Sequence, residues 1–227
     1  MFGTIEGGGT KYVCAVGTGP GAGMLARIEF PTGNDPSKLL ANVVAWFREQ
    51  ERIHGRLNAI GFASFGPVDL RRGFITSTPK PGWQNTDVLT PLKNAFPGIP
   101  VAFDTDTNGA ALGEHTWGNA QGLNDYVYIT MGTGIGAGIM ANGQLVHGLV
   151  HPELGHLFLP TIPGDTFEGA CPFHGRCWEG LCSGPAIQKR TGTSAAELPA
   201  DHPAWEWITQ YVGYAFANLV QLFGGFQ

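Results

Sequence analysis

The chain has 227 residues, which is enough for one large domain or for two smaller lobes. Its composition is 43% hydrophobic and 14% charged with 35 glycines, which excludes a disordered or fibrous protein and favours a globular, loop-rich one. The formal net charge of −5, without any segment dense in Lys or Arg, argues against nucleic acid as a partner.

The first third of the chain predicts a β-hairpin, a helix and two further strands. Apolar runs at residues 12–16 and 24–30 flank a Gly/Pro-rich turn at 17–23, which is a hairpin signal. Asp35-Pro36 then provides an N-cap and an N1 proline for a helix over residues 36–53. Strand-like runs follow at the end of this region, over residues 59–65 and 73–78.

The rest of the chain repeats the hairpin. A short buried strand at 101–103 runs into a predicted helix that begins near Ala110. A second glycine-turned hairpin covers residues 126–140, and helical spacing returns over residues 205–222. Two halves that each open with such a hairpin predict a duplicated α/β unit. Residues 151–187 are predicted to be irregular.

Two glycine turns are candidate phosphate-binding loops. The first is Gly7-Gly8-Gly9-Thr10-Lys11 and the second is Gly132-Thr133-Gly134-Ile135-Gly136. Such turns let backbone N–H groups approach a polyphosphate, and the threonine hydroxyls add donors. Neither turn is a Walker loop, and each taken alone is also explained as a tight hairpin turn.

The acidic pair Asp104 and Asp106 lies at the predicted strand-to-helix corner, with Asn108 next to it. A carboxylate in this position could take a proton from a substrate hydroxyl. The alternative is that both residues are helix caps, a role in which Asp is favoured. On spacing alone, capping is the favoured explanation, and only the context of the other motifs can overturn it.

The densest motif is a cluster of Cys171, His174 and Cys177, which offers three zinc ligands within seven residues. Candidates for the fourth ligand are His156, His151 and Cys182. The absence of a signal-peptide pattern and of a membrane-length apolar run leads us to expect a cytoplasmic protein, without a membrane partner, in which such a cluster indicates metal rather than disulfides. We expect a closed, structural site.

These motifs together resemble the ROK family of sugar kinases and repressors, and within it the bacterial zinc-containing fructokinases. The resemblance rests on EGGGTK, DTDTNGAALGE, MGTGIGAG and HPELGH followed by CPFHGRCWEGLCSGPAI. It implies a two-lobed α/β protein of the ribonuclease H-like, actin-like ATPase fold. The lobes would be residues 1–117, with the first phosphate loop and the catalytic Asp, and residues 118–227, with the second phosphate loop and the zinc-bound sugar loop.

The resemblance also implies the reaction and its residues. It implies ATP-dependent transfer of phosphate to a hexose, first of all fructose, giving fructose 6-phosphate, with Asp106 as general base. The nucleotide contacts would be Gly8, Gly9, Thr10, Lys11, Gly132, Thr133, Gly134 and Gly136. The sugar contacts would be Glu153, His156 and Glu179. The zinc ligands would be His156, Cys171, His174 and Cys177. ATP, Mg²⁺ and Zn²⁺ are the implied cofactors, and a homodimer is the implied assembly.

Two departures from the family pattern qualify this expectation. Glu6 stands where the family has an Asp beside Mg²⁺. Family members also continue for several dozen residues beyond the position of Gln227, so we expect this chain to lack a C-terminal part, to expose apolar surface, and to bind nucleotide weakly with little turnover. The alternatives are a glucose, mannose or N-acetylmannosamine kinase, and a non-catalytic sugar-binding protein. A sugar-sensing regulator would need an N-terminal helix-turn-helix, which the sequence does not show.

Overall fold

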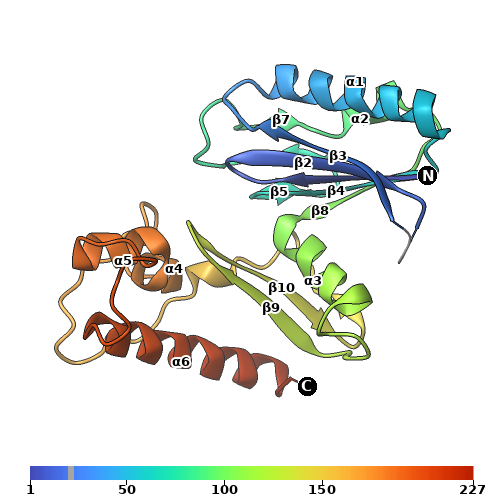
Figure 1. The fold of residues 1–227 in the computed structure, drawn as a ribbon. Coiled ribbons are helices and arrows are strands. Elements are labelled where there is room, and N and C mark those ends of the chain that lie inside the picture. Colours follow the sequence, from blue (N-terminus) through green and yellow to red (C-terminus); the bar gives the residue numbers. More distant parts are fainter. Residues whose placement is uncertain (20–22, 227) are drawn as a thin grey trace. The chain divides into compact units, whose positions relative to one another are not determined.

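The computed structural model describes residues 1–19 and 23–226. These form two compact units, Met1–Gly109 with Leu149–His151, and Ala110–Gly148 with Pro152–Gln227 (Figure 1). The functional lobes expected at residues 1–117 and 118–227 stay a prediction. Within the described ranges, every helix is too short or too polar to cross a bilayer.

A five-stranded sheet forms the centre of the first unit. From edge to edge its strand order is β3-β2-β1-β4-β8. The bounds are Phe2–Gly7 (β1), Lys11–Gly17 (β2), Met24–Pro31 (β3), Ala59–Ser64 (β4) and Val101–Thr105 (β8). The β1-β2-β3 pairs are antiparallel, whereas β1, β4 and β8 run parallel.

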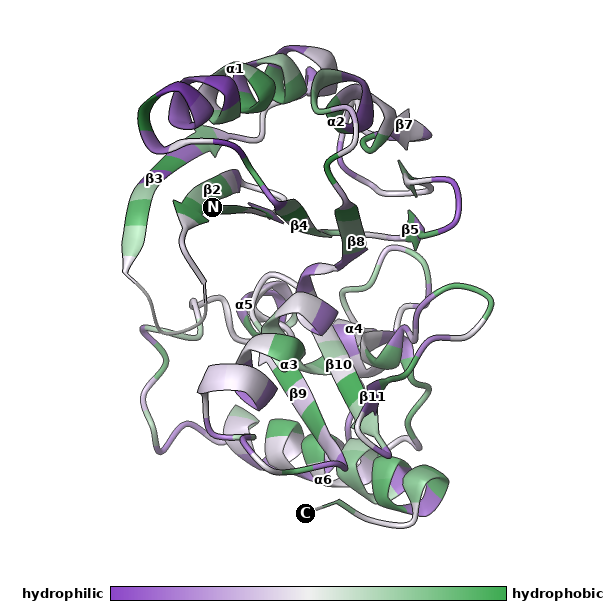
Figure 2. Ribbon diagram, turned by 90° about the vertical axis from the view of Figure 1, so that its right-hand side faces the viewer, coloured by the Kyte–Doolittle hydropathy of each residue, from purple (hydrophilic) through white to green (hydrophobic). Residues whose placement is uncertain are grey.

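Helices α1 (Pro36–His54) and α2 (Thr90–Ala95) pack against this sheet. The Asp35 carboxylate accepts a hydrogen bond from the Lys38 N–H, and Pro36 follows it, so the predicted N-cap and N1 proline are confirmed. Figure 2 shows hydrophobic and hydrophilic residues alternating along α1, as expected for an amphipathic helix. The buried α1 side chains contact those of the strands in one hydrophobic core.

Strand β1, which is central to the sheet, is missing from the sequence prediction. Its inward positions are Gly3, Ile5 and Gly7, so only one of the three has a large apolar side chain. A Cβ at Gly3 would come within 2.8 Å of the Phe47 ring, which shows that the glycine lets α1 approach the strand closely. The alternation of hydrophobic residues that announces a strand is therefore absent, although the strand is fully paired on both sides.

A small second sheet completes the first unit. It contains β5 (Val68–Asp69), β6 (Phe74–Ile75) and β7 (Thr86–Asp87) in that order. The strand predicted over residues 73–78 is thus only two residues long. The 12–16 and 24–30 strands are confirmed as β2 and β3, while the centre of the turn predicted between them, residues 20–22, lies outside the described residues.

Among the described residues, the second unit contains a three-stranded antiparallel sheet and five helical segments. The sheet order is β11-β10-β9, with bounds Gln144–Leu145, Ile135–Ala141 and Tyr126–Met131. The helical segments are α3 (Asp106–Trp117), η1 (Leu154–His156), α4 (Trp178–Cys182), α5 (Gly184–Thr191) and α6 (Ala204–Phe223). Helix α3 begins in the first unit and continues in the second.

The second hairpin and the last helix are confirmed, and the region predicted as irregular contains η1, α4 and the start of α5. Helix α6 buries Ile208, Tyr211 and Leu219 in the core of its unit. It also exposes Phe216, Val220 and Leu222, the last of them 67% exposed. Part of the apolar surface expected from the sequence is therefore found on α6.

Candidate active site and metal centre

The first glycine turn and the acidic corner lie at the same edge of the five-stranded sheet. Gly7 at the end of β1 is in register with Ser64 at the end of β4, and Ser64 is in register with Thr105 at the end of β8. Because the three strands are parallel, their carboxyl ends form one row. In open α/β sheets this edge is where ligands bind. Residues distant in sequence therefore meet at one candidate site.

Helix α3 is capped by Thr105 rather than by either aspartate. The Thr105 Oγ1 accepts the Asn108 N–H at 3.1 Å, which is the usual N-cap bond to the third helical residue. Asp104 accepts bonds from the Thr105 N–H and the Asn108 side-chain amide, both at 2.8 Å. The Asp106 carboxylate accepts the N–H of Thr107 at 2.8 Å. Asp106, the first residue of the helix, is thus not needed as its N-cap.

The surroundings of Asp106 favour a proton acceptor. Burial raises the pKa of its carboxyl above the ordinary value, and the negative charge of Glu6 adds to this effect. The Thr107 N–H and His151 act in the opposite direction. A carboxylate whose pKa is moved upward is a stronger base near neutral pH than an exposed one.

We expect the Glu6→Gln variant to move the acidic limb of its pH–rate profile to lower pH. Removing the Glu6 charge removes a cause of the raised pKa of Asp106, so the carboxylate ionises at lower pH. The measurement is kcat/KM against pH, with Glu49→Gln on α1 as the control. An unchanged limb in Glu6→Gln, or the same shift in the control, would contradict this coupling.

The first glycine turn closes the β1–β2 hairpin. The Gly8 N–H donates to the Lys11 carbonyl at 2.9 Å, and the Thr32 hydroxyl donates to the Gly8 carbonyl at 2.7 Å. Gly9 and Thr10 are exposed at the tip. The Lys11 ammonium lies 3.0 Å from the Glu29 carboxylate on β3. Such exposed ion pairs are weak, so an anion could displace Glu29 from the Lys11 ammonium at little cost in free energy.

The second glycine turn closes the β9–β10 hairpin in the other unit. The Gly132 N–H donates to the Gly134 carbonyl at 2.8 Å, and Gly132 and Thr133 are exposed. Ile135, which follows, is buried. The turn therefore presents Thr133 at the surface, while the buried Ile135 anchors it to the core.

Four side chains converge in the second unit as a candidate metal centre. The ligand atoms of His156, Cys171, His174 and Cys177 all lie within 4.8 Å of one another. The His156 Nδ1 lies 3.4 Å from the Cys177 sulfur and 3.8 Å from that of Cys171. The His174 Nδ1 also lies 3.8 Å from the Cys171 sulfur.

These separations fit tetrahedral zinc. With Zn–S near 2.3 Å and Zn–N near 2.0 Å, tetrahedral geometry separates sulfur and nitrogen ligands by about 3.5 Å. Burial raises the pKa of the Cys177 thiol to about 11, and the Cys171 thiol adds to the effect. Two buried thiols facing two imidazoles are a costly arrangement without a cation, whereas zinc binds the deprotonated thiols directly.

The fourth position of this group is held by His156. Cys182 instead directs its sulfur to the Ile208 carbonyl, 3.9 Å away in the hydrophobic core. His151 belongs to the other compact unit. His156 ends η1, which packs on β10 so closely that a Cβ at Gly155 would overlap the Ile135 carbonyl oxygen. The glycine of HPELGH therefore allows the backbone approach that positions His156.

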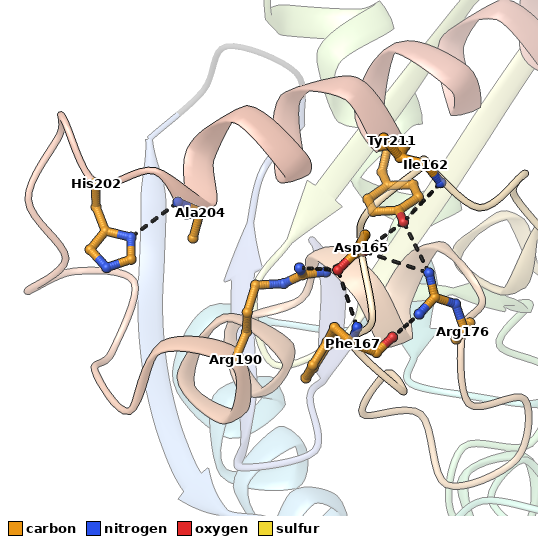
Figure 3. Close-up of polar contacts among 8 residues, drawn as sticks. All are labelled: Ile162, Asp165, Phe167, Arg176, Arg190, His202, Ala204 and Tyr211. Atoms are coloured by element: carbon orange, nitrogen blue, oxygen red, sulfur yellow. Dashed lines mark hydrogen bonds and ion pairs between the residues drawn. The ribbon is translucent and has the colours of Figure 1, made fainter.

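A buried polar network ties the segment between His156 and Cys177 to the helices of the second unit (Figure 3). The Asp165 carboxylate pairs with the Arg190 guanidinium of α5 through bonds of 2.7 and 3.1 Å, and accepts the Tyr211 hydroxyl of α6 at 2.6 Å. Arg176 donates to the Phe167 carbonyl and, at 3.1 Å, to the Tyr211 hydroxyl. Arg176 directly precedes Cys177, so the network reaches the metal group.

We expect the Asp165→Asn variant to lose about 3–5 kcal/mol of stability at neutral pH, because it leaves the buried Arg190 charge without its partner. Burial alone would raise the pKa of Asp165, but the bonds from Arg190, Tyr211 and the Phe167 N–H lower it from 3.8 to about 2. Since the folded pKa is depressed, the stabilisation is present above about pH 4 and is lost as pH falls through 2. Urea denaturation at pH 7 and pH 3 would measure both effects.

The matched control for this variant is Glu49→Gln, because Glu49 pairs with Arg52 on an exposed face of α1. We expect its stability to equal that of the unchanged protein within error. An Asp165→Asn variant that is equally stable would contradict the role given to the network.

Sequence reasoning missed the network and the Thr105 cap. Asp165, Arg176 and Arg190 have no periodic spacing or motif, so only the folded chain brings them together. Trp83 is fully buried, and its indole N–H donates to the Gly33 carbonyl. It is a core residue.

Comparisons with known proteins give the family to which the chain belongs. The family model described as "ROK family" matches residues 2–224. The chain is 46% identical to the fructokinase of Zymomonas mobilis over 94% of this chain and 73% of the relative. It is 42% identical to the fructokinase of Pediococcus pentosaceus over 98% of this chain and 76% of the relative.

A solved structure gives the same result. The crystal structure of a ROK hexokinase from Thermus thermophilus superposes with a TM-score of 0.81 and 32% identity, over 98% of this chain and 78% of that chain. The chain belongs to the ROK family. The expected ribonuclease H-like, actin-like ATPase fold is confirmed by this likeness.

Proposed function

We propose that the protein phosphorylates a hexose with ATP, and that the hexose is D-fructose, giving fructose 6-phosphate. The observation that carries this proposal is the strand register that puts the first glycine turn and Asp106 at one edge of the sheet. The identity of 42% and 46% to proteins named fructokinase supports fructose as the sugar.

In this proposal Asp106 is the general base. It takes the proton of the sugar's primary hydroxyl, whose oxygen forms a bond to the γ-phosphorus while the bond from that phosphorus to the ADP oxygen breaks. The proton ends on the Asp106 carboxylate. The raised pKa of Asp106 suits this role, because it brings the base nearer to neutral pH.

The two glycine turns are proposed to bind the phosphates. Gly8, Gly9 and Thr10, with Lys11, would serve as the first loop, and Gly132, Thr133, Gly134 and Gly136 as the second. Gly9, Thr10 and Thr133 are exposed at the tips of these turns, where backbone N–H groups and hydroxyls are suitable donors to phosphate oxygens. Neutralisation of phosphate charge is what phosphoryl transfer requires most.

The Glu6 carboxylate fits a magnesium ligand at this edge. The Glu6 charge is close enough to raise the pKa of Asp106, so two carboxylates share one region, and oxygen is the ligand that Mg²⁺ prefers. When bound, Mg²⁺ would neutralise the negative charge of the phosphates. Glu6 is proposed as the residue that holds it.

The metal group is proposed to be a structural zinc site that shapes a sugar-binding loop. His156 turns Nδ1 toward the two cysteine sulfurs, so its other ring nitrogen is the one available to a sugar hydroxyl. This allows one residue to be both zinc ligand and sugar contact. Glu153 is exposed and Glu179 half-buried, and both are proposed to bind further hydroxyls.

The test is coupled ADP release with ATP and Mg²⁺ against fructose, glucose, mannose and N-acetylmannosamine. ATP is supplied at high concentration, because weak nucleotide binding is expected. If kcat/KM is highest with fructose, the result supports the proposal. If it is highest with another hexose, that hexose is the substrate instead of fructose. Sugar binding in calorimetry without ADP release would favour the non-catalytic alternative. Light scattering of the same sample would test the homodimer that we also propose.

A further inference from the structure

The Glu179 side chain contacts the second glycine turn. The Ile135 N–H donates to the Glu179 Oε2 at 2.9 Å. The same oxygen lies 2.7 Å from the position that a Cβ of Gly134 would occupy, so the glycine leaves room for the carboxylate against the turn. One oxygen of a residue considered above as a sugar contact is therefore engaged by the backbone of the hairpin.

A second bond holds the other end of the turn. The Gly184 N–H, at the start of α5, donates to the Gly132 carbonyl at 2.8 Å. Glu179 lies in the first turn of α4, and α4 is followed directly by α5 through Ser183. The corner of α4 and α5 is thus hydrogen-bonded to the turn at both Gly132 and Ile135.

The corner of α4 and α5 is itself held in place by capping hydrogen bonds and by buried side chains. The Cys177 sulfur accepts the Gly180 N–H and caps α4, and the Ser183 hydroxyl accepts the Ala186 N–H and caps α5. Trp178 and Leu181 on α4 are buried in the core of the unit. Because short helices are rarely stable alone, the caps and the buried side chains give the corner its rigidity.

We propose that Glu179 is a positioning residue for the second phosphate turn. Its Oε2 holds the Ile135 N–H inward, and this fixes the turn so that its remaining backbone donors point outward to the nucleotide. The inference rests on the proposed function of this turn. It gives Glu179 an influence on ATP binding that a role as sugar contact alone would not give.

The experiment compares Glu179→Ala with Glu179→Gln. The amide oxygen of Gln can still accept the Ile135 N–H, whereas Ala cannot. Loss of a hydrogen bond to a charged acceptor leads us to expect a rise of about tenfold in KM for ATP in Glu179→Ala. The KM for ATP of Glu179→Gln is expected to stay within about threefold of that of the unchanged protein, whereas its KM for fructose can rise, because Glu179 is also a proposed sugar contact.

Hydrogen exchange of the segment 130–138 gives a readout that does not require turnover. We expect faster deuterium uptake in Glu179→Ala and unchanged uptake in Glu179→Gln. Gly134→Ala places a methyl group against the Glu179 carboxylate and should also speed uptake, while leaving the carboxylate in the chain. Thermal melting identifies any variant that has failed to fold, and the remaining variants then decide the question.

Three results would overturn the inference. The first is slow exchange and an unchanged KM for ATP in Glu179→Ala, with only the KM for fructose raised. The second is a Glu179→Gln variant that loses ATP binding as severely as Glu179→Ala, since charge would then matter rather than the bond. The third is unchanged exchange in both Glu179→Ala and Gly134→Ala. Failure of the proposed function is separate, because it would appear as an inactive unchanged protein.

Discussion

Asp106→Asn is expected to lower kcat for fructose phosphorylation by about 10²–10⁴-fold, with a much smaller change in KM. Removing a general base removes an interaction made in the transition state, and the amide cannot accept the hydroxyl proton. Coupled ADP release under saturating ATP and fructose would measure the effect. The helix should stay intact, because Thr105 rather than Asp106 provides its cap.

The matched control is Asp104→Asn, which changes the neighbouring carboxylate at the same corner. Asp104 accepts bonds from the Thr105 N–H and the Asn108 side chain, and an Asn oxygen could accept either of them. We expect its kcat to stay within about tenfold of the unchanged protein. If Asp106→Asn kept full kcat, or if both variants lost activity equally, Asp106 would not be the base.

Cys177→Ser is expected to lose bound zinc and several kcal/mol of stability. Structural zinc contributes directly to folding free energy, and serine is a far weaker zinc ligand than a thiolate. Metal analysis of the purified protein should give about one zinc per chain before the substitution and a small fraction of that after it. The serine hydroxyl can still accept the Gly180 N–H that caps α4, so a lower midpoint in urea denaturation would report the loss of zinc.

Cys14→Ala is the control for the thiol itself, because Cys14 is buried in the core of the other unit. It should keep the full zinc content. A chelator should reproduce the loss of stability in the unchanged protein and have little effect on Cys177→Ser. Zinc-free purified protein whose stability does not respond to added zinc would contradict the proposed site.

The motifs determined much of the candidate chemistry without the structure. A cluster of cysteine and histidine needs only a short loop to bring its ligands together, so Cys171, His174 and Cys177 were readable from spacing. The N-cap and proline of α1 were also readable, since capping is a local effect. The glycine turns and the second hairpin follow from the same kind of short-range information.

The sequence could not decide between roles that depend on long-range contacts. Spacing left Asp104 and Asp106 as caps or bases, and the fold showed that Thr105 caps the helix. The spacing left three candidates for the fourth ligand of the metal group. The fold selects His156, because η1 packs closely on β10. The sequence pattern did not predict strand β1, because two of its three inward residues are glycines. Their place in the sheet is fixed by neighbouring strands rather than by hydrophobicity.

What the sequence alone determined is the set of local motifs: turns, caps, the metal-ligand cluster and the family pattern. What only the tertiary structure decided is which of these act together. The row formed by Gly7, Ser64 and Thr105 depends on strand register, and the bond from Ile135 to Glu179 joins residues 44 positions apart. Local patterns are encoded by neighbouring residues, whereas pairing and packing are settled by the free energy of the whole folded chain.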